Sequence, residues 1–481
     1  MIQVQNQRWW NEAHQLTADQ KLTKWFLNTV QPIDAVNDEY FKDFLDYLNP
    51  NYNLPSDKNL KLLIHRSFEW SESTMKELLS SSAVSISMTM DLWTSRAKQG
   101  YIGITASFIS SDFKLYDILL DVKYLSYPHT AERIKDQINH LISEWNLTNK
   151  VVAIATDNGS NMVKAVRLID GVIRIPCTAH TLQLIIGKGL ELATVLVLRA
   201  KRLIQFFMSP KQMERLKDVQ IELNYDNILG AIGDVSTRWN STYLAWDRLL
   251  YLRDAIEELA AKLFHDRDSN VKKDGRQIKK INLSDDEWNF MESLITLLSL
   301  FEEATTLLGG SNYTTLSLMH PVISDLKAKF KDQALSASSF TKPIIINLTK
   351  LITILDDEDN EELIEFLSEN DDEIIHPTTK TKIKINLPMP TEGILDQIKI
   401  IISQAFDKYW NEPSDLGLIA SLLDPHVKGL SFVTPSERIK AKDLIKDELQ
   451  KLKSKENNSD SPTPIIDIPE FGMYYIFLHN F

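Results

Sequence analysis

The sequence has only one cysteine, Cys177, among its 481 residues. A single cysteine excludes both an intramolecular disulfide and a zinc site built from several cysteines, so we expect an intracellular protein without structural zinc. Residues 1–15 have no basic segment followed by an apolar one, and no apolar run approaches the ~18 residues that span a bilayer. We therefore expect neither secretion nor insertion into a membrane.

Basic residues are also scarce relative to acidic ones, at 53 against 66, which gives a formal net charge of -13. Because binding to nucleic-acid phosphates requires clustered Lys and Arg, this total by itself argues against nucleic acid. Eleven of the acids, however, lie in residues 356–373, a segment without a single base. Two runs elsewhere, residues 199–217 and 266–280, are locally basic. They are candidate phosphate-binding faces, or else ordinary solvated helix faces and loops.

The length of the chain predicts two or three domains. The periodicity of its apolar residues divides it into four parts. Residues 1–82 form an N-terminal helical region, because apolar residues recur at spacings of three and four. Residues 83–208 are rich in β-strand patterns. Residues 209–435 are mainly helical, with an acidic segment at about 355–392 that we expect to be flexible. Residues 436–481 begin as a helix and end in an atypical polar and then aromatic tail.

The order of elements within residues 83–208 predicts an α/β fold. Three β-rich runs, VSISMTMDLWTS, YIGITASFIS and KLYDILLDVKYL, are typical of an antiparallel meander. A helical pattern follows in TAERIKDQINHLISEW, and then KVVAIATD, a strand that is apolar on both faces and so belongs in the middle of a sheet. The order βββαβ predicts a ribonuclease-H-like core, with a further all-α part after it.

The predicted order of strands and helix indicates where two aspartates lie in the sheet. Asp91 lies in the first strand and Asp157 closes the last one. In a βββαβ fold of the ribonuclease H type these strands pair in parallel, so their carboxylates come within reach of each other. Such a pair repels itself unless a cation binds, and Mg²⁺ or Mn²⁺ suits carboxylate, water and phosphate oxygens. Asp91 and Asp157 are therefore predicted metal ligands and catalytic residues for phosphoryl transfer. The alternative is that both bond nearby amides in turns or at strand ends.

Six blocks of the sequence resemble hAT-superfamily DNA transposases and the zinc-finger-BED proteins of the RICESLEEPER type that derive from them. The resemblance implies a ribonuclease-H-like core split by a large helical insertion, a nuclear location, and Asp91 and Asp157 as the first two acids of a DDE metal site. The blocks occur in family order between about residues 20 and 435 and read LTKWFLNTVQPIDAVNDEYFKDFLDYLNPNYNLPS, SMTMDLWTSRAKQGYIGITASFI, VVAIATDNGSNMVKAV, IPCTAHTLQLII, DVSTRWNSTYLAWDRLL and IASLLDPHVKGLSF.

The resemblance also singles out four further residues. Cys177 and His180 match the family's Cys-x-x-His pattern, but two ligands are too few for zinc. His180 is therefore predicted to support the metal ligands without touching the metal or to contact a nucleic-acid strand, or else to be a packed imidazole. Arg238 and Trp239 fall in the family's Arg-Trp block. Arg can bind phosphate and Trp can stack on an unpaired base. The alternative for Trp239 is that it anchors the helical insertion to the core.

Two departures from the family pattern bear on function. No cysteine precedes the core, so the family's BED finger is not expected here. The string Ser436–Arg438 resembles the segment that supplies the third acid, but it lies too early, and we interpret it as a helix start with Ser436 as the cap and Glu437 in the first turn. Glu132, near where ribonucleases H carry an acid, is interpreted as a surface charge close to Lys135.

Three functions remain open from the sequence. The favoured one is a transposase-derived nucleic-acid-binding protein that is catalytically impaired by loss of the third acid. The second is an active Mg²⁺-dependent DNA transposase that cuts and joins strands. The third is a helical scaffold that binds other proteins without DNA. The expected partners are DNA and either a second copy of the chain or other proteins, with no membrane.

Overall fold

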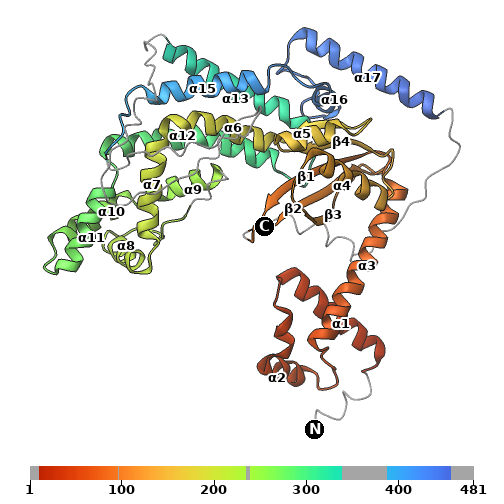
Figure 1. Ribbon diagram of the computed structural model, residues 1–481, viewed down its shortest axis with the longest axis horizontal. Coiled ribbons are helices and arrows are strands. Elements are labelled where there is room, and N and C mark those ends of the chain that lie inside the picture. Colours follow the sequence, from red (N-terminus) through yellow and green to blue (C-terminus); the bar gives the residue numbers. More distant parts are fainter. Residues whose placement is uncertain (1–9, 96, 234–238, 339–386, 457–481) are drawn as a thin grey trace. The chain divides into compact units, whose positions relative to one another are not determined.

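The structure is a computed structural model, and it describes residues 10–95, 97–233, 239–338 and 387–456 (Figure 1). Most of the predicted acidic segment, Arg238 and the tail after residue 456 lie outside the described residues. The chain divides into two compact units. Within the described residues, the first comprises residues 10–126 and 135–153, and the second comprises residues 127–134 and 154–456.

The N-terminal part of the first unit is helical, as predicted. It contains α1 (Glu12–Thr29), the 3₁₀ helix η2 (Ile33–Asn37), α2 (Glu39–Leu48) and α3 (Asp57–Ser82). Each α-helix starts with a polar cap, since the side chains of Asn11, Asp38 and Ser56 accept hydrogen bonds from backbone N–H groups of the first turns. A small core built around Phe26 and Leu60 joins these helices.

Among the described residues, the sheet has five strands in the order β3-β2-β1-β4-β5. They are β1 (Ile86–Thr94), β2 (Gly100–Ile109), β3 (Leu115–Leu125), β4 (Val151–Thr156) and β5 (Ile173–Pro176). The first three form the predicted antiparallel meander, with a register shift between Ile104 and Thr105. Helix α4 (Ala131–Glu144) lies between β3 and β4 in the chain. The prediction of a mixed α/β fold is therefore confirmed.

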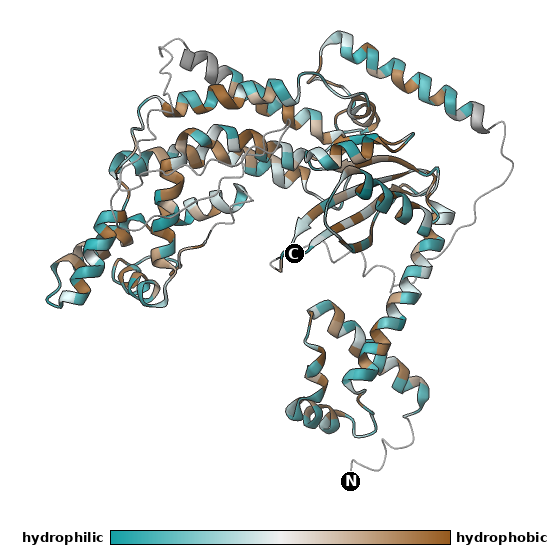
Figure 2. Ribbon diagram, in the orientation of Figure 1, coloured by the Kyte–Doolittle hydropathy of each residue, from teal (hydrophilic) through white to brown (hydrophobic). Residues whose placement is uncertain are grey.

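The second unit is mainly helical, as the sequence predicts for its larger part. Figure 2 shows hydrophobic and hydrophilic residues on the same helices, which is typical of elements that bury one face. The helices are α5 (Ser160–Arg167), α6 (Thr178–Leu190), η3 (Glu191–Ala193), α7 (Thr194–Phe207), α8 (Pro210–Glu222), α9 (Trp239–Tyr251), α10 (Arg253–His265), α11 (Ser269–Ile281), α12 (Asp285–Leu308), α13 (Leu316–Ser338), α15 (Ile394–Tyr409), α16 (Asp415–Leu423) and α17 (Pro435–Glu456).

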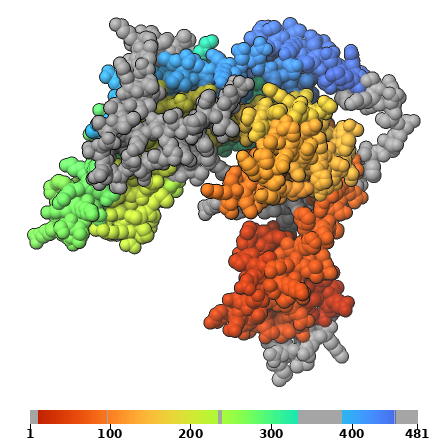
Figure 3. Space-filling view, viewed as in Figure 1, coloured from red at the N-terminus to blue at the C-terminus, as the bar shows by residue number. Residues whose placement is uncertain are grey.

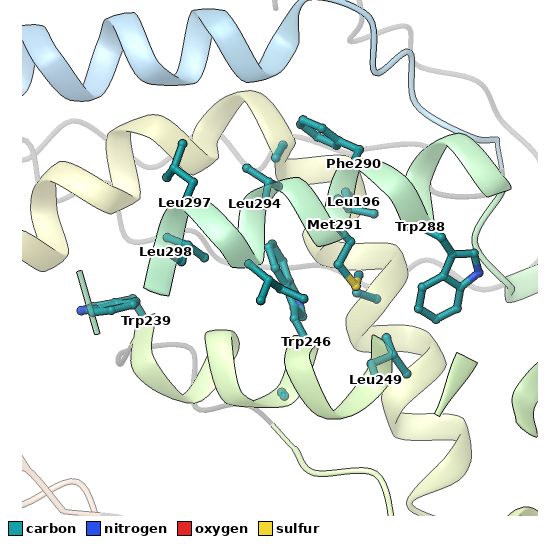
Figure 4. Packing of buried hydrophobic residues seen from close by; sticks show 14 of the residues in the cluster. Leu196, Trp239, Trp246, Leu249, Trp288, Phe290, Met291, Leu294, Leu297 and Leu298 are labelled. Carbon is teal, nitrogen blue, oxygen red and sulfur yellow. The ribbon is translucent and has the colours of Figure 1, made fainter. Parts of the chain in front are cut away.

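A single large hydrophobic core joins helices from α6 to α15. Trp246 of α9 is fully buried and points toward α12, where Met291 and Leu294 lie beside it (Figure 4). Full burial of one large side chain contributes about 2–3 kcal/mol. Burial of apolar side chains across this core is therefore the main contribution to the stability of the second unit.

One expectation about apolar segments needs correction. The stretch Thr178–Phe207, which forms α6, η3 and α7, is long and apolar enough to cross a membrane by length and composition alone. Its Leu182, Ile185 and Leu203 are fully buried in the core of the second unit. A central core helix of a globular unit needs the same hydropathy as a membrane span, and this packing accounts for it.

The start of α17 also differs from the prediction in its cap. Thr434, not Ser436, precedes the helix: its Oγ1 accepts the N–H of Glu437, and the Glu437 carboxylate accepts the N–H of Thr434 at 2.7 Å. Pro435 occupies the first helical position, where its missing N–H has no consequence. The helix start itself is confirmed, and Glu437 acts in a capping box.

A buried histidine joins α13 to α16. His320 is 6% exposed, and its Nε2 accepts the backbone N–H of Ser414 at 3.0 Å. The Ser414 hydroxyl in turn accepts the N–H of Gly417 and caps α16. Burial lowers the pKa of His320 from 6.5 to about 4, although the nearby Glu437 carboxylate raises it in part. The imidazole is therefore neutral in the folded protein at physiological pH.

This pKa makes the second unit sensitive to mild acid. Below pH 6.5 the unfolded chain protonates His320 while the folded chain does not, so the stabilisation present above pH 6.5 is lost as pH falls toward 4. We expect a loss of about 2 kcal/mol at pH 5 relative to pH 7.5, measured by urea unfolding. His320→Gln should flatten this dependence, whereas the control His265→Gln, at an exposed histidine, should leave it unchanged. Equal pH dependence in all three proteins would contradict the assignment to His320.

Candidate functional site

Asp91 lies on the exposed side of β1. From Ile86 to Met90 every second residue is buried, and the residues between them, followed by Asp91, are exposed. Across the sheet Asp91 is paired with Gly103 of β2. Within the part of the chain that the structure describes, the Asp91 carboxylate makes no hydrogen bond or ion pair. It is thus a solvent-facing carboxylate in the middle of a sheet, with both oxygens available to a ligand.

A row of aromatic residues crosses the same face of the sheet, starting at Trp93, two residues after Asp91 on β1. Trp93, Tyr101 and Tyr124 are consecutive partners in the registers of β1, β2 and β3. The Trp93 and Tyr101 rings stack with centroids 6.0 Å apart, and the Tyr101 and Tyr124 rings meet edge to face at 6.1 Å. Trp93 is 39% exposed and Tyr124 is 58% exposed. Core aromatics would be buried, so this row offers rings to solvent beside Asp91.

Gly103 allows this arrangement. A Cβ atom at that position would lie 2.9 Å from Cζ3 of Trp93, closer than real Cβ contacts come. The indole can therefore lie over β2 only because its diagonal neighbour lacks a side chain. The aromatic row was not predicted from the sequence. The signal was present, since Trp93 follows Asp91 by two residues and shares its face, but only the register between strands places the two tyrosines beside it.

Asp157 follows β4 directly, in the second unit. Its Oδ1 accepts the backbone N–H of Gly159 at 3.1 Å. This is the turn-forming geometry that the sequence analysis gave as an alternative. It engages one carboxylate oxygen only, and among the described residues nothing donates a hydrogen bond to Oδ2. The turn and a role as a metal ligand are compatible with each other.

The loop that carries Asp157 is held by a network from β5 and α6. The Arg174 guanidinium donates to the Thr156 hydroxyl at 3.0 Å, to the Asn158 side-chain oxygen at 2.8 Å and to the Asp157 carbonyl oxygen. Asn158 also donates to the Thr181 hydroxyl at 3.0 Å. Arg174 was not identified from the sequence, because nothing local shows that β5 brings it to the end of β4.

The Cys-x-x-His pattern marks the passage from β5 into α6. The N–H of Cys177 donates to the carbonyl oxygen of Thr156 at 2.7 Å, and its carbonyl oxygen accepts the Thr181 hydroxyl at 2.8 Å. His180 lies in the first turn of α6 and is half-buried. Cys177 thus helps to fix the loop of Asp157 through its backbone, and the predicted contact of His180 with nucleic acid stays a prediction.

Trp239 begins α9 and is 8% exposed. Its ring meets Phe301 of α12 edge to face with centroids 6.2 Å apart, within the large core (Figure 4). Trp239 is thus a buried residue within the helical part, and its predicted roles in stacking on a base or in anchoring this part to the ribonuclease-H-like core stay predictions. Its predicted partner in nucleic-acid binding, Arg238, lies outside the described residues.

Glu132 pairs with a residue that the sequence did not indicate. Its Oε1 lies 2.9 Å from Nζ of Lys164 on α5, and no ion pair with Lys135 is formed among the described residues. Hydrogen bonding to Lys164 lowers the pKa of the Glu132 carboxyl below its ordinary value. Both side chains are exposed, so the interpretation of Glu132 as a surface charge stands, with Lys164 as its partner.

Carboxylates of this kind suit a hard divalent cation. In the residues that the structure describes, no group of three or more His, Cys, Asp or Glu side chains comes together in a way that could hold a metal ion. Asp91 and Asp157 each keep at least one uncommitted oxygen, which is the donor that Mg²⁺ and Mn²⁺ prefer. Their action as a pair remains a prediction from the order of the strands.

Comparison with known proteins gives two family matches. Residues 89–178 match the ZBED1 RNase-like domain, and residues 175–297 match the ZBED1 RNase-like helical domain. The first range contains Asp91, Asp157 and Cys177, and the second contains His180 and Trp239. The candidate residues thus fall within the matched domains.

Curated relatives agree with these matches. The putative AC transposase of Zea mays is 27% identical over 311 residues, covering 62% of this chain and 37% of that protein. RICESLEEPER 2 of Oryza sativa subsp. japonica, a zinc finger BED domain-containing protein, is 22% identical, covering 62% and 42%. DAYSLEEPER of Arabidopsis thaliana, of the same description, is 24% identical, covering 63% and 44%.

The chain belongs to the hAT transposase-derived proteins. It spans less than half the length of each of these three relatives. The aspartates of this hAT-derived chain lie in its RNase-like part, Asp91 on the first strand and Asp157 after the fourth. The family resemblance inferred from six sequence blocks is therefore confirmed, and the roles of individual residues are separate questions.

Proposed function

We propose that this hAT-derived chain is a nuclear nucleic-acid-binding protein with a ribonuclease-H-like fold, and that its Asp91 and Asp157 bind Mg²⁺ or Mn²⁺. The element order βββαβ and the strand order β3-β2-β1-β4-β5 support the fold assignment. The names of its relatives, which include a transposase and BED-type zinc finger proteins, support the nucleic-acid partner and the nuclear location.

The observation that carries the proposal is the exposed face of β1, β2 and β3. An unpaired carboxylate, Asp91, lies two residues before Trp93, which with the half-buried Tyr101 and the exposed Tyr124 forms an aromatic row. Aromatic rings stack on unpaired bases with about 1–3 kcal/mol per base, whatever the base. A carboxylate beside such rings is suited to hold a divalent cation against a phosphate oxygen of the same strand. Unpaired nucleotides fit both features, whereas a protein partner has no need of the cation.

Catalysis by this chain is proposed to be impaired. In phosphoryl transfer, bound Mg²⁺ or Mn²⁺ stabilises charge on the attacking and leaving oxygens. The chain's own residues would orient the strand: Trp93 by stacking on a base, and Arg174 by fixing the loop of Asp157. The family's metal site uses three acids, and the residues assigned here supply two. We therefore propose binding to DNA without efficient strand cleavage.

The proposal is tested with a fluorescent DNA duplex that carries a short unpaired end, compared with the same duplex with blunt ends. Wild-type chain in Mn²⁺ should prefer the unpaired end by at least fivefold, as about 1 kcal/mol or more of stacking implies. Trp93→Leu should lose that preference. Removal of Mn²⁺ by EDTA should weaken DNA binding by the wild type, and Asp91→Asn should bind as weakly in Mn²⁺ as the wild type does in EDTA. Fluorescence anisotropy measures all four proteins, the fourth being the control Tyr40→Leu, at an exposed tyrosine on α2.

Two results would contradict this assignment. If Trp93→Leu and Tyr40→Leu change the preference equally, the aromatic row has no special role. If binding of the wild type is the same in Mn²⁺ and in EDTA, Asp91 does not act through a metal. Two further results would favour the other functions. Efficient cleavage of either duplex by the wild type would overturn the proposed impairment of catalysis and favour the active transposase. Affinity that does not change with salt would favour the protein scaffold.

A further inference from the structure

Helix α11 has a concentration of positive charge that the chain as a whole does not share. Its thirteen residues include five bases and one acid, Asp274, in a protein of net charge -13. Four of the bases are exposed and the fifth, Lys272, is half-buried. The exposed bases are Lys273, Arg276, Lys279 and Lys280. Among the described residues, none of the five is within ion-pair distance of a carboxylate.

The packing of α11 fixes which side faces solvent. Gly275, Ile278 and Ile281 are buried, and the helix packs against α10. At Gly275 the approach is so close that an added Cβ atom would lie 2.5 Å from the backbone nitrogen of Phe264. The helix therefore cannot roll on α10, and its basic residues are held on the opposite side. Figure 3 shows α8, α10 and α11 at the surface in yellow-green and green.

The single acid of α11 is already neutralised. The Oδ2 of Asp274 lies 2.7 Å from Nζ of Lys211 and 2.8 Å from Nη1 of Arg215, both on α8. Burial raises the pKa of Asp274, but hydrogen bonds from Lys211, Arg215 and Gln212 outweigh this and lower the pKa below its ordinary value. The carboxylate thus stays ionised and binds α8 to α11.

This ion-pair cluster unites two separate basic segments of the sequence. Residues 199–217 end in α8, and residues 266–280 form most of α11. Asp274 joins the two segments on the packed side of α11, and the bases of α11 lie on its exposed side. We call this exposed side the α8–α11 face, after the two helices that the ion pairs join, and define it by Lys272, Lys273, Arg276, Lys279 and Lys280. Lys279 and Lys280 also line a hollow with His265.

We infer that the α8–α11 face is a docking surface for the phosphate backbone of duplex DNA, an inference that rests on the proposed binding of DNA by this chain. From Lys273 to Lys280 the helix rises about 10 Å. Duplex DNA carries one negative charge per ~1.7 Å of its axis, so several phosphates face this length of helix. Contacts to phosphates carry no sequence information, so a face that binds the phosphate backbone positions the duplex and does not select its sequence.

The test replaces Lys273, Arg276 and Lys280 by glutamine together, and measures binding to a blunt 30-base-pair duplex at several salt concentrations. Loss of three phosphate contacts should weaken binding about tenfold or more and reduce the slope of log affinity against log salt by about 3. The control replaces Lys442, Lys446 and Lys451 of α17 by glutamine, which changes the net charge equally. On α17 these lysines are interspersed with acids, and Lys446 and Lys451 pair with Asp443 and Glu448. Circular dichroism and thermal unfolding confirm that both variants fold.

The outcomes separate this inference from the proposed function. Loss of affinity and slope in the α11 variant, with the α17 variant like the wild type, supports the α8–α11 face. If the wild type binds and the α11 variant binds equally, or if both variants weaken equally, the face is not the docking surface, although the binding of DNA stands. If the wild type does not bind the blunt duplex at low salt, the inference is overturned, and the proposed function is overturned as well if the duplex with an unpaired end is not bound either.

Discussion

Replacing Glu287 by alanine is expected to lower the free energy of unfolding of the second unit by about 3–5 kcal/mol. Glu287 is 0% exposed, and its Oε1 lies 2.9 Å from Nε of Arg199, whose side chain is 4% exposed. The same carboxylate accepts the N–H of Met389 at 3.1 Å and that of Ser284 at 2.9 Å. The alanine variant leaves a buried guanidinium without its carboxylate and two N–H groups without an acceptor, and each loss is costly.

A matched control lies on the same helix. Glu292 of α12 is exposed and pairs with no described residue, so Glu292→Ala should change the free energy of unfolding by less than about 0.5 kcal/mol. The double variant Arg199→Met, Glu287→Leu should recover much of the stability lost in Glu287→Ala, because neither buried charge remains. Urea unfolding followed by tryptophan fluorescence measures all of them. A double variant no more stable than Glu287→Ala would show that the unpaired charge is not the main cause.

The second large effect is expected from Gly275→Ala. The added Cβ atom would lie 2.5 Å from the backbone nitrogen of Phe264 and 2.6 Å from the carbonyl carbon of Leu263. Backbone atoms cannot turn away as a flexible side chain can, so α11 must move from α10. We expect a loss of about 3 kcal/mol, the upper end of the range for overpacking, despite the gain of about 1 kcal/mol in helix propensity.

Gly187 of α6 provides the comparison. It is also a helical glycine, but an added Cβ atom there meets nothing within 4 Å. Gly187→Ala should therefore stabilise the protein by up to about 1 kcal/mol. Thermal unfolding of the two variants side by side gives opposite shifts of the midpoint if close packing at α10 is the cause. A stable Gly275→Ala variant would show that α11 can shift without loss, and would weaken the argument that α10 fixes the orientation of the basic face.

These variants also bear on the proposed docking surface. Gly275 and Asp274 are neighbours in α11, the first holding the helix against α10 and the second binding it to α8. A shift of α11 would move all its exposed bases together. Reduced affinity for duplex DNA in Gly275→Ala would thus follow from displacement, whereas the glutamine variant removes charge without displacement. The two effects are distinguished by the slope against salt, which a loss of charge lowers most directly.

Local patterns in the sequence were sufficient for much of the fold. Strand β1 was predicted from the β-rich run that contains Asp91, and β4 from the apolar run before Asp157. The helices after residue 208 were predicted from the spacing of apolar residues. These signals are local, since burial of one face of a strand or helix repeats every two or about 3.6 residues along the chain itself. Family blocks, too, are properties of the sequence, and they identified the hAT relationship.

Tertiary structure decided where side chains from distant segments meet. The aromatic row of Trp93, Tyr101 and Tyr124 depends on strand register, and the ion pairs of Asp274 join residues about sixty positions apart. The sequence left open whether Trp239 is buried, and only the structure shows its ring 8% exposed among the helices. The physical reason is the same in each case. Periodicity shows which face of an element is buried, but which other element covers that face depends on packing across the whole unit, and no local pattern records it.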